Sequence, residues 1–346
     1  MRHLYDMRFD EMKAWLKVLQ QPGYRAQQIF QWLYQWRVTD VMQMSNLPQK
    51  LRDQLQQTTH LTTSHEVTRQ VSRVDGTTKF LLGWPDGVTV ETVLMRHDYG
   101  NSVCVSSQVG CKMGCNFCAS TLGGMIRQMS AGEMVEQVLY SQRLLDSQDE
   151  RVSSIVLMGS GEPMDNYDEV MRFIDIVNDP NGLNIGQRHI TVSTVGLVPG
   201  IIRLADEGRP VTLAVSLHAP TDELRSSMMP INKAYPIAEL MQACRYYVHK
   251  TGRRISFEYA LIGGKNDSLQ EARSLAELLR DMPVHVNLIP VNFVPERSYT
   301  RTPSHKVQEF LNELKAMGVN ATIRREMGDD ISAACGQLRA EQAGRL

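Results

Sequence analysis

An alternation of short apolar stretches with longer amphipathic ones fills residues 100 to 291 and leaves few folds open to the chain. The apolar stretches predict six β-strands, at 102–109, 153–159, 189–194, 211–217, 255–261 and 285–291. The segments between them have the apolar spacing of helices, at 131–145, 167–178, 198–208, 237–250 and 269–282. This order predicts an α/β fold with a parallel sheet, either open or curled toward a barrel. Ligand sites in such folds lie at the carboxyl ends of the strands.

Other patterns flank this region. The chain is predicted to consist of a helical accessory domain (1–60), a β-extension (61–99), the α/β domain (100–295) and a C-terminal part (296–346). The accessory domain has Ile29, Leu33 and Trp36 at helical spacing. The β-extension has three predicted strands, at 66–73, 78–84 and 88–95. The C-terminal part is expected to contain a helix, a strand and a loop, at 306–318, 320–326 and 328–338.

The charge balance argues against a strongly basic nucleic-acid-binding protein. Lys and Arg total 37 and Asp and Glu total 38, so the formal net charge is −1. A polyanionic partner would therefore have to be bound by a local basic patch. No apolar run approaches the ~20 residues of a membrane span, and the charged N-terminal stretch lacks a signal-peptide core. We therefore expect a cytoplasmic protein without a membrane partner.

Three of the six cysteines, Cys111, Cys115 and Cys118, lie close together just after the first predicted strand. In a reducing compartment, clustered thiols favour metal binding or catalysis over structural disulfides. Three thiolates can each bind one iron of a cubane cluster and leave the fourth iron open, whereas electron carriers supply four cysteines. A structural zinc site would need a fourth ligand, which His218 could supply only through the fold.

Polar residues follow the next three predicted strands. Gly161 and Glu162 follow the second strand, Ser193 ends the third, and Ser216, Leu217 and His218 end the fourth. Each has a simpler explanation, because a Gly-Glu-Pro sequence can be a plain turn, a serine can cap a helix and a lone histidine can be structural. Their occurrence at three successive strand ends favours a shared ligand site.

The cysteine motif, with the aromatic Phe117 before its last member, resembles the signature of radical S-adenosylmethionine (SAM) enzymes. The resemblance implies a partial (βα)6 barrel and a [4Fe–4S] cluster on Cys111, Cys115 and Cys118. It also implies that the open iron binds SAM and that an electron from the cluster then splits SAM to a 5′-deoxyadenosyl radical. The polar strand-end residues would then be SAM contacts, with Glu162 meeting the SAM amino group.

A narrower resemblance covers nearly the whole chain. The chain is similar to the RlmN/Cfr family of RNA adenine methyltransferases in the sequences VETVLM, SVCVSSQVGC, CNFCASTLGG, GEPMDN, SLHAP, HVNLIPVN and AACGQL. The GEP and CASTLGG sequences are more similar to the RlmN type than to the Cfr type. This resemblance implies methylation at adenine C2 in 23S rRNA, in the peptidyl-transferase region, and in tRNA, beside the anticodon. It also implies two SAM molecules per turnover and a flavodoxin as electron donor.

The family resemblance assigns roles to four further residues. Cys335 would be methylated by one SAM, Cys104 would be its resolving partner in a transient disulfide, Glu91 would accept the adenine proton and Asn292 would contact SAM. From the residues alone, each cysteine could be a small buried hydrophobe, and Glu91 could be an edge-strand carboxylate paired with Lys79.

Three other features bear on the assignment. Cys244 lies at helical spacing with apolar residues and is predicted to be part of the core. Ser332 stands where the family motif usually has aspartate, so the position of the Cys335 loop or the acidity of its thiol could differ. Basic and aromatic residues in 24–37 and 245–254, and Arg324 with Arg325, could bind RNA phosphates and bases or could be solvated helix ends.

Alternatives to C2 methylation remain open at this point. One is Cfr-type methylation at C8 of the same rRNA adenine, which the residues alone do not separate from C2 methylation. Another radical-SAM reaction would not require Cys104 and Cys335. A redox-sensing iron–sulfur protein that binds RNA without catalysis would not cleave SAM. No feature demands a dimer, and we expect a monomer.

Overall fold

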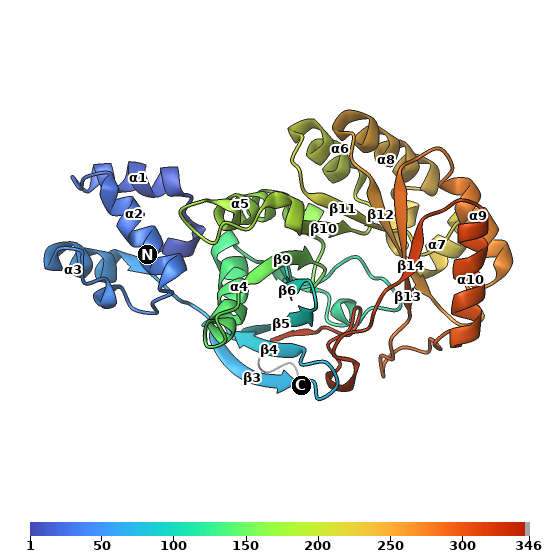
Figure 1. Cartoon of the computed structure of the whole chain (residues 1–346), viewed down its shortest axis with the longest axis horizontal. Coiled ribbons are helices and arrows are strands. Elements are labelled where there is room, and N and C mark those ends of the chain that lie inside the picture. Colours follow the sequence, from blue (N-terminus) through green and yellow to red (C-terminus); the bar gives the residue numbers. More distant parts are fainter. Residues whose placement is uncertain (343–346) are drawn as a thin grey trace.

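One sheet of 11 strands extends through the computed structural model, which describes residues 1–342 (Figure 1). Its parallel part follows chain order: β6 (Gly100–Cys104), β9 (Val152–Leu157), β10 (Ile190–Thr194), β11 (Thr212–Ser216), β12 (Ile255–Leu261), β13 (Val284–Pro290) and β14 (Ala321–Ile323). The predicted α/β fold is confirmed. The C-terminal strand β14 was expected outside the barrel, but it extends the parallel sheet beyond β13.

Helices cover the outer face of the parallel strands (Figure 1). They are α4 (Ala131–Asp146), α5 (Tyr167–Asn178), α6 (Val198–Glu207), α7 (Asp222–Met228), α8 (Ile237–Thr251), α9 (Leu269–Leu278) and α10 (Ser304–Ala316). Helix α4 begins with a capping box between Ser130 and Glu133, which satisfies two backbone donors at its start. The apolar faces of six of these helices and the sheet form one core. Helix α7 is the exception, because its Met228 packs with Cys111 and Cys115 in a second cluster. Cys244 on α8 is fully buried in the core of the six helices and the sheet, as predicted.

The β-extension continues the same sheet in the antiparallel sense. It consists of β3 (His65–Val71), β4 (Thr78–Gly83) and β5 (Val88–His97), and β5 pairs with β6. The short strand β15 (Ala340–Gln342) pairs with residues 88–90 of β5, next to the stretch 93–97 that pairs with β6. Strand β6 at the start of the barrel and the C-terminal strand β15 therefore both pair with β5.

The predicted strand 102–109 is two strands. Strand β6 ends at Cys104, and β7 (Gln108–Gly110) pairs separately with β8 (Met125–Gln128). Between them, the side chain of Gln137 accepts from the Ser106 N–H at 2.8 Å and donates to the Ser106 carbonyl at 2.9 Å. Because a glutamine on α4 takes both backbone groups of Ser106, the chain leaves the sheet there and can form the cysteine loop.

The N-terminal helical region lies beside α4 and α5 (Figure 1). It contains α1 (Phe9–Val18), α2 (Tyr24–Phe30), a π-helical turn (Gln31–Gln35) and α3 (Gln49–Thr58), and strands β1 (Arg2–His3) and β2 (Thr59–His60) close it. Polar contacts join it to the barrel: His3 lies 2.9 Å from Glu136, and Asp6 accepts from the Gly132 N–H at 2.5 Å.

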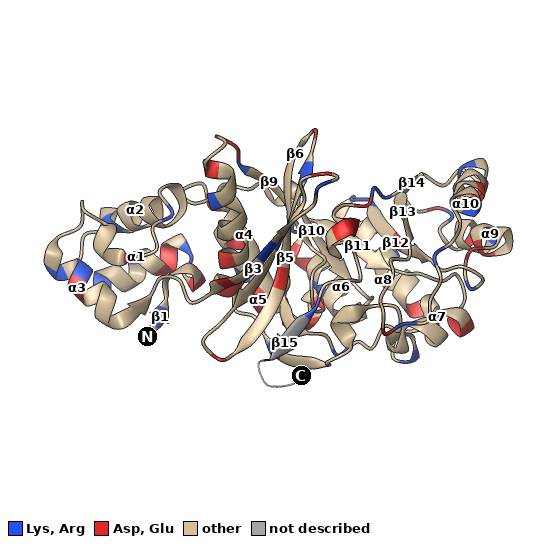
Figure 2. Ribbon diagram, turned by 90° about the horizontal axis from the view of Figure 1, so that it is seen from below, with Lys and Arg blue, Asp and Glu red and all other residues tan. Residues whose placement is uncertain are grey.

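Basic and acidic residues are interspersed along the ribbon of the whole molecule (Figure 2). This agrees with the formal net charge of −1. Within residues 1–342, the structure contains no helix of the length and apolar character that a membrane crossing requires.

Candidate active site

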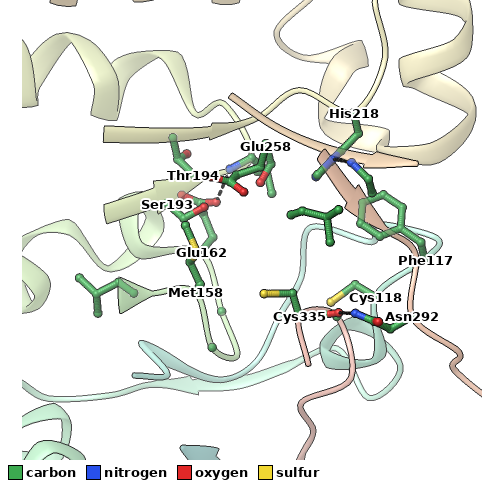
Figure 3. A pocket seen from close by; sticks show the side chains of 18 of the residues that line it. Phe117, Cys118, Met158, Glu162, Ser193, Thr194, His218, Glu258, Asn292 and Cys335 are labelled. Atoms are coloured by element: carbon green, nitrogen blue, oxygen red, sulfur yellow. Dashed lines mark hydrogen bonds between the residues drawn. The ribbon is translucent and has the colours of Figure 1, made fainter. Parts of the chain in front are cut away.

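Two cavities lie on the inner side of the parallel sheet: the first is at the carboxyl ends of the strands, and the second extends from there to the beginnings of β6, β9 and β10. The first is bordered by the predicted site residues Cys118, Gly161, Glu162, Ser193, Ser216, His218, Asn292 and Cys335. Figure 3 shows how they lie: Cys118 and Cys335 are on one side of the cavity, Glu162 and Ser193 are on another, and His218 faces Phe117. The structure therefore brings together residues that are more than 200 positions apart in the sequence.

The three clustered thiols lie on the loop after β7. Cys111 and Cys115 are buried in one apolar cluster, and Cys118 packs against it. The loop bends sharply at Gly110, which has φ +76° and approaches Gly124 so closely that a Cβ would lie 1.9 Å from its carbonyl oxygen. Burial raises the pKa of Cys111 to about 12, and burial and the neighbouring thiols raise the pKa of Cys115 well above its ordinary value.

Three soft sulfur donors on a buried loop fit an iron–sulfur cluster. Bound metal would supply the positive charge that buried thiolates need. Within residues 1–342, no group of three or more His, Cys, Asp and Glu side chains has the arrangement to hold a metal ion. A cubane has a different geometry, because each thiolate binds its own iron at a separate corner. Cys111, Cys115 and Cys118 are the residues that would hold such a cluster.

The loop after β9 presents Glu162 to the first cavity. Gly161 has φ +108°, and a Cβ there would lie 2.6 Å from the Cβ of Gln108, so only glycine fits. The Glu162 carboxylate accepts from the Val195 N–H at 2.8 Å and from the Met164 N–H at 3.0 Å. Burial raises the pKa of Glu162 to about 7. A cationic ligand group in the cavity would favour its ionised form.

His218, two residues after the end of β11, borders the first cavity as a neutral imidazole. Its Nδ1 accepts from the Ala260 N–H at 2.8 Å, and burial lowers the pKa of His218 to about 3. Its ring meets Phe117 edge-on, with centroids 4.9 Å apart. The neighbouring Leu217 was predicted as a ligand contact. Its side chain is fully buried, and it is not among the described residues that border this cavity.

The second cavity, of about 460 Å³, adjoins the first. Cys104, at the end of β6, borders only this second cavity, whereas Cys335, Asn292 and Arg324 border both. Both cysteines are free thiols in this structure. Burial and the charge of Cys335 raise the pKa of Cys104 to about 12, and the cation of Arg324 opposes the increase. The thiol of Cys335 thus stands at the boundary between two compartments.

The loop that carries Cys335 is held by hydrogen bonds to the barrel. The Asn292 side chain donates to the Cys335 carbonyl at 2.9 Å. The Ala119 N–H donates to the Gly336 carbonyl at 2.8 Å, and the Ser120 hydroxyl donates to the Leu338 carbonyl at 2.7 Å. Because Ala119 and Ser120 directly follow Cys118, the Cys335 loop and the cluster loop hold each other in place.

Glu91 does not border either of these cavities. Its carboxylate lies 2.9 Å from the Lys79 ammonium and accepts from the Arg339 N–H at 2.7 Å. It borders a third cavity together with Lys79, Ser332 and Arg339. Lys79 also donates to the Ser332 carbonyl at 3.2 Å. In this structure the Lys79–Glu91 pair therefore holds both ends of the Cys335 loop, and the role of Glu91 as a proton acceptor stays a prediction.

Two charged residues at the site were not predicted as site residues. Arg324 lies between the cavities, 3.6 Å from the Glu258 carboxylate on β12, and Glu258 borders the first cavity. The charges of Cys335, Glu258 and Cys104 raise the pKa of the Arg324 guanidinium. The sequence feature that could have identified Glu258 is its position inside an otherwise apolar strand. A carboxylate buried there requires a partner, which points to a site.

A curled parallel sheet with a three-thiol loop and a Gly-Glu-Pro loop at its strand ends is the architecture of radical-SAM enzymes, and the family model of the Radical SAM superfamily matches residues 105–279. The family model described as "Ribosomal RNA large subunit methyltransferase N-terminal domain" matches residues 2–61. The chain belongs to the RlmN family of radical-SAM RNA methyltransferases.

Two relatives and one solved structure carry this assignment. The probable dual-specificity RNA methyltransferase RlmN of Geobacillus kaustophilus is 58% identical over 339 residues, which cover 98% of this chain and 93% of that protein. The protein of the same description in Bacillus pumilus is 57% identical over 342 residues, 99% of this chain and 95% of that protein. A crystal structure of a radical SAM methyltransferase from Sphaerobacter thermophilus is 48% identical with a TM-score of 0.95, covering 98% and 99% of the two chains.

Proposed function

We propose that the protein methylates C2 of an adenine in 23S rRNA and in tRNA, using Cys335 as the carrier of the methyl group. One observation carries the proposal: Cys335 borders both cavities, while Cys104 borders only the second. A thiol at such a boundary can be loaded from one side and used on the other. The description of the relatives as dual-specificity RNA methyltransferases supports the substrate class.

The chemistry of adenine explains why a carrier is needed. C2 of adenine is electrophilic and does not attack the methyl group of SAM. The Cys335 thiolate is a competent nucleophile; it forms the S–CH3 bond, and S-adenosylhomocysteine leaves. When bound, the cluster and a second SAM supply the 5′-deoxyadenosyl radical that removes a hydrogen atom from this methyl group. Glu162, Ser193, Ser216, His218 and Asn292 are the residues proposed to hold SAM.

The second cavity is where we place the adenine. Addition of the Cys335 methylene radical to C2 joins protein and RNA covalently and leaves an unpaired electron on the ring. Loss of the C2 proton, and of that electron to the cluster that Cys111, Cys115 and Cys118 would hold, would restore the aromatic ring. The Cys104 thiolate then forms a disulfide with Cys335; the carbon–sulfur bond breaks, and the released CH2 carbon takes a proton to give the methyl product. Glu91 is proposed as acceptor of the C2 proton. Because its carboxylate faces Lys79 and Arg339, this role requires the Cys335 loop to shift.

The remaining assignments concern the setting of the reaction. We propose a cytoplasmic monomer that receives its electrons from a flavodoxin. The predicted contact of the helical region with RNA stays part of this proposal. A match to a ribosomal RNA methyltransferase N-terminal domain over residues 2–61 supports it.

Anaerobic cluster reconstitution followed by reaction with SAM, a reductant and unmodified rRNA or tRNA tests the proposal. Mass spectrometry of the nucleosides is expected to show 2-methyladenosine. Comparison with synthetic standards separates this product from 8-methyladenosine, the Cfr-type alternative. Cleavage of SAM by an intact cluster without any methyladenosine would refute the proposal. Absence of SAM cleavage would instead favour a non-catalytic iron–sulfur protein.

A further inference from the structure

An aromatic stack stands at the turn between β5 and β6. The rings of His97 and Tyr99 lie parallel, with centroids 4.7 Å apart and planes 5° apart. Tyr99 is 81% exposed. One face of its ring is therefore covered by His97, and the rest of the ring is open to solvent. An exposed aromatic ring that a neighbouring ring holds in place is preorganised to stack on a third ring.

The turn belongs to the wall of the second cavity. His97 and Tyr99 border this cavity, and so does Cys104 at the other end of β6. The five steps along the chain from Tyr99 to Cys104 span roughly 16 Å at ~3.3 Å per residue of strand. A ring at this distance cannot contact the adenine that meets Cys104. It can contact a nucleotide a short way along the same strand.

The cavity also presents cations without acidic partners. Arg188 and Arg325 border it and are exposed. Among the ion pairs of residues 1–342, neither has a carboxylate partner. Two acidic residues, Asp98 and Glu326, border the same cavity; Glu326 is paired with Arg301, and Asp98 is exposed at the turn between His97 and Tyr99. Free guanidinium groups beside an exposed aromatic ring are the combination that binds single-stranded nucleic acid, through phosphates and bases respectively.

We propose that Tyr99 is a stacking platform for an unpaired base next to the target adenosine, and that Arg188 and Arg325 bind the phosphates of that RNA segment. The proposal rests on the proposed function, because it takes the adenine at Cys104 and Cys335 as its reference point. A single open ring face can receive only a base that is splayed out of a helix. Loops and strand ends of RNA are therefore the expected ligands, and intact duplex is not.

The neighbours of the stack fit this role. Burial and the cations Arg325 and Arg324 lower the pKa of His97 below its ordinary value of 6.5. The imidazole under Tyr99 is therefore neutral at physiological pH. The stacked pair thus presents an uncharged ring surface with the cations Arg324 and Arg325 and the carboxylates Asp75 and Asp98 around it. The ring would bind the base, and the guanidinium groups would bind the phosphates.

A double-substitution experiment on protein and RNA tests the platform. The reconstituted holoenzyme would be titrated anaerobically with a stem–loop RNA that contains the target adenosine, and with a series of abasic RNAs. In the series, one base at a time is removed on either side of the target. For the wild-type protein, one abasic position should weaken binding about 5- to 150-fold, the range for one stacked base. Tyr99→Ala should bind intact RNA as weakly as the wild-type protein binds that abasic RNA. Removal of the same base should then cause no further loss of affinity for the variant.

Matched variants separate stacking from other effects. Tyr99→Phe should restore most of the affinity, because it keeps the ring, and Tyr99→Leu should not. Val74→Ala, at the turn between β3 and β4 with 82% exposure, is the control for substitution at an exposed turn. Arg325→Gln should weaken all RNAs of the series by a similar factor and reduce the salt dependence of binding.

The outcomes distinguish this proposal from the proposed function. If every abasic RNA loses the same affinity with Tyr99→Ala as with wild-type protein, the platform is wrong even though 2-methyladenosine forms. If Tyr99→Ala binds all RNAs within twofold of wild type, the platform is also wrong. If the coupling between Tyr99 and one base is found but no methyladenosine forms with any variant, the platform stands and the assigned reaction fails.

Discussion

Glu136 on α4 joins the N-terminal region to the barrel, and its replacement by glutamine should weaken that junction. The carboxylate is 1% exposed and lies 2.9 Å from His3 Nε2. It accepts from the Thr63 N–H at 2.9 Å, from the Thr63 hydroxyl at 2.8 Å and from the Ser64 N–H at 2.8 Å, and the Ser64 hydroxyl adds a further bond. All these partners lie in the first 64 residues of the chain.

The cost of Glu136→Gln follows from this count. Glutamine keeps one acceptor oxygen but turns an NH2 group toward donors. At least one buried backbone N–H then lacks a partner, at about 1–3 kcal/mol. Loss of the charge opposite His3 brings the expected decrease in the free energy of unfolding to about 3–5 kcal/mol. At ~2–4 °C per kcal/mol for a chain of this size class, the melting temperature should fall by roughly 6–20 °C.

The effect should also depend on pH. Burial alone would raise the pKa of Glu136, but His3 lowers it below its ordinary value of 4.5. Burial alone would lower the pKa of His3, but Glu136 raises it above 6.5. The pair therefore stabilises the protein fully between pH 4.5 and 6.5. Its contribution is lost as the pH rises through the folded-state pKa of His3, or falls through that of Glu136.

Urea unfolding of wild type and Glu136→Gln at pH 6 and pH 9 measures both effects. Glu150→Gln is the matched control, because Glu150 is 42% exposed and its pair with Arg96 should contribute less than about 1 kcal/mol. The reasoning is refuted if Glu136→Gln unfolds within 1 kcal/mol of wild type at pH 6, or if the difference between them increases from pH 6 to pH 9.

Three further predictions concern the site. Cys104→Ala should accumulate protein covalently joined to RNA, visible on denaturing gels. Cys335→Ala should form neither adduct nor product but should keep the absorbance of the cluster. Normal turnover by Cys104→Ala would exclude the resolving role of Cys104. Gly161→Ala should abolish SAM binding in calorimetry, because its Cβ would lie 2.6 Å from Gln108 at φ +108°, while Gly208→Ala, with no atom within 4 Å of its Cβ, should bind SAM normally. Asn292→Ala should slow the methylation of Cys335, because the Cys335 loop would lose its position. The rise in activation free energy, from rates measured by intact-protein mass spectrometry, should exceed the ~1 kcal/mol of one hydrogen bond. An unchanged rate would mean that the backbone hydrogen bonds of the loop are sufficient to hold it.

The fold was predictable from the sequence because hydrophobic period and element length agree along the barrel. Six predicted strands correspond to β6, β9, β10, β11, β12 and β13. The division after Cys104 was not predictable, because it depends on a tertiary contact between Gln137 and Ser106. Strand β14 was predicted as a strand, but its place in the sheet depends on pairing with β13, and no local pattern specifies that partner.

The site was predictable in part. Strand ends identified Glu162, Ser193, Ser216 and His218, and the structure places all four at one cavity. Cys104 and Cys335 were predicted from the family resemblance. No rule of residue spacing predicts that two cysteines so far apart in the sequence border one cavity. Leu217 follows from its motif alone, and its side chain faces the core. The position of Glu91 beside Lys79 and Arg339 depends on how the C-terminal segment crosses β5, which is a property of the folded chain.

The position of Cys335 at the boundary between two cavities has a kinetic consequence. In the proposed reaction, loading of the methyl group would use only the first cavity, so it would not have to wait for RNA to occupy the second. Cells that contain SAM but little unmodified RNA should therefore hold a reserve of protein already charged with one methyl group. A protein molecule that already carries the methyl group on Cys335 would need only one further SAM, the one that forms the radical, to methylate the next RNA. The first turnover would therefore be faster than those that follow.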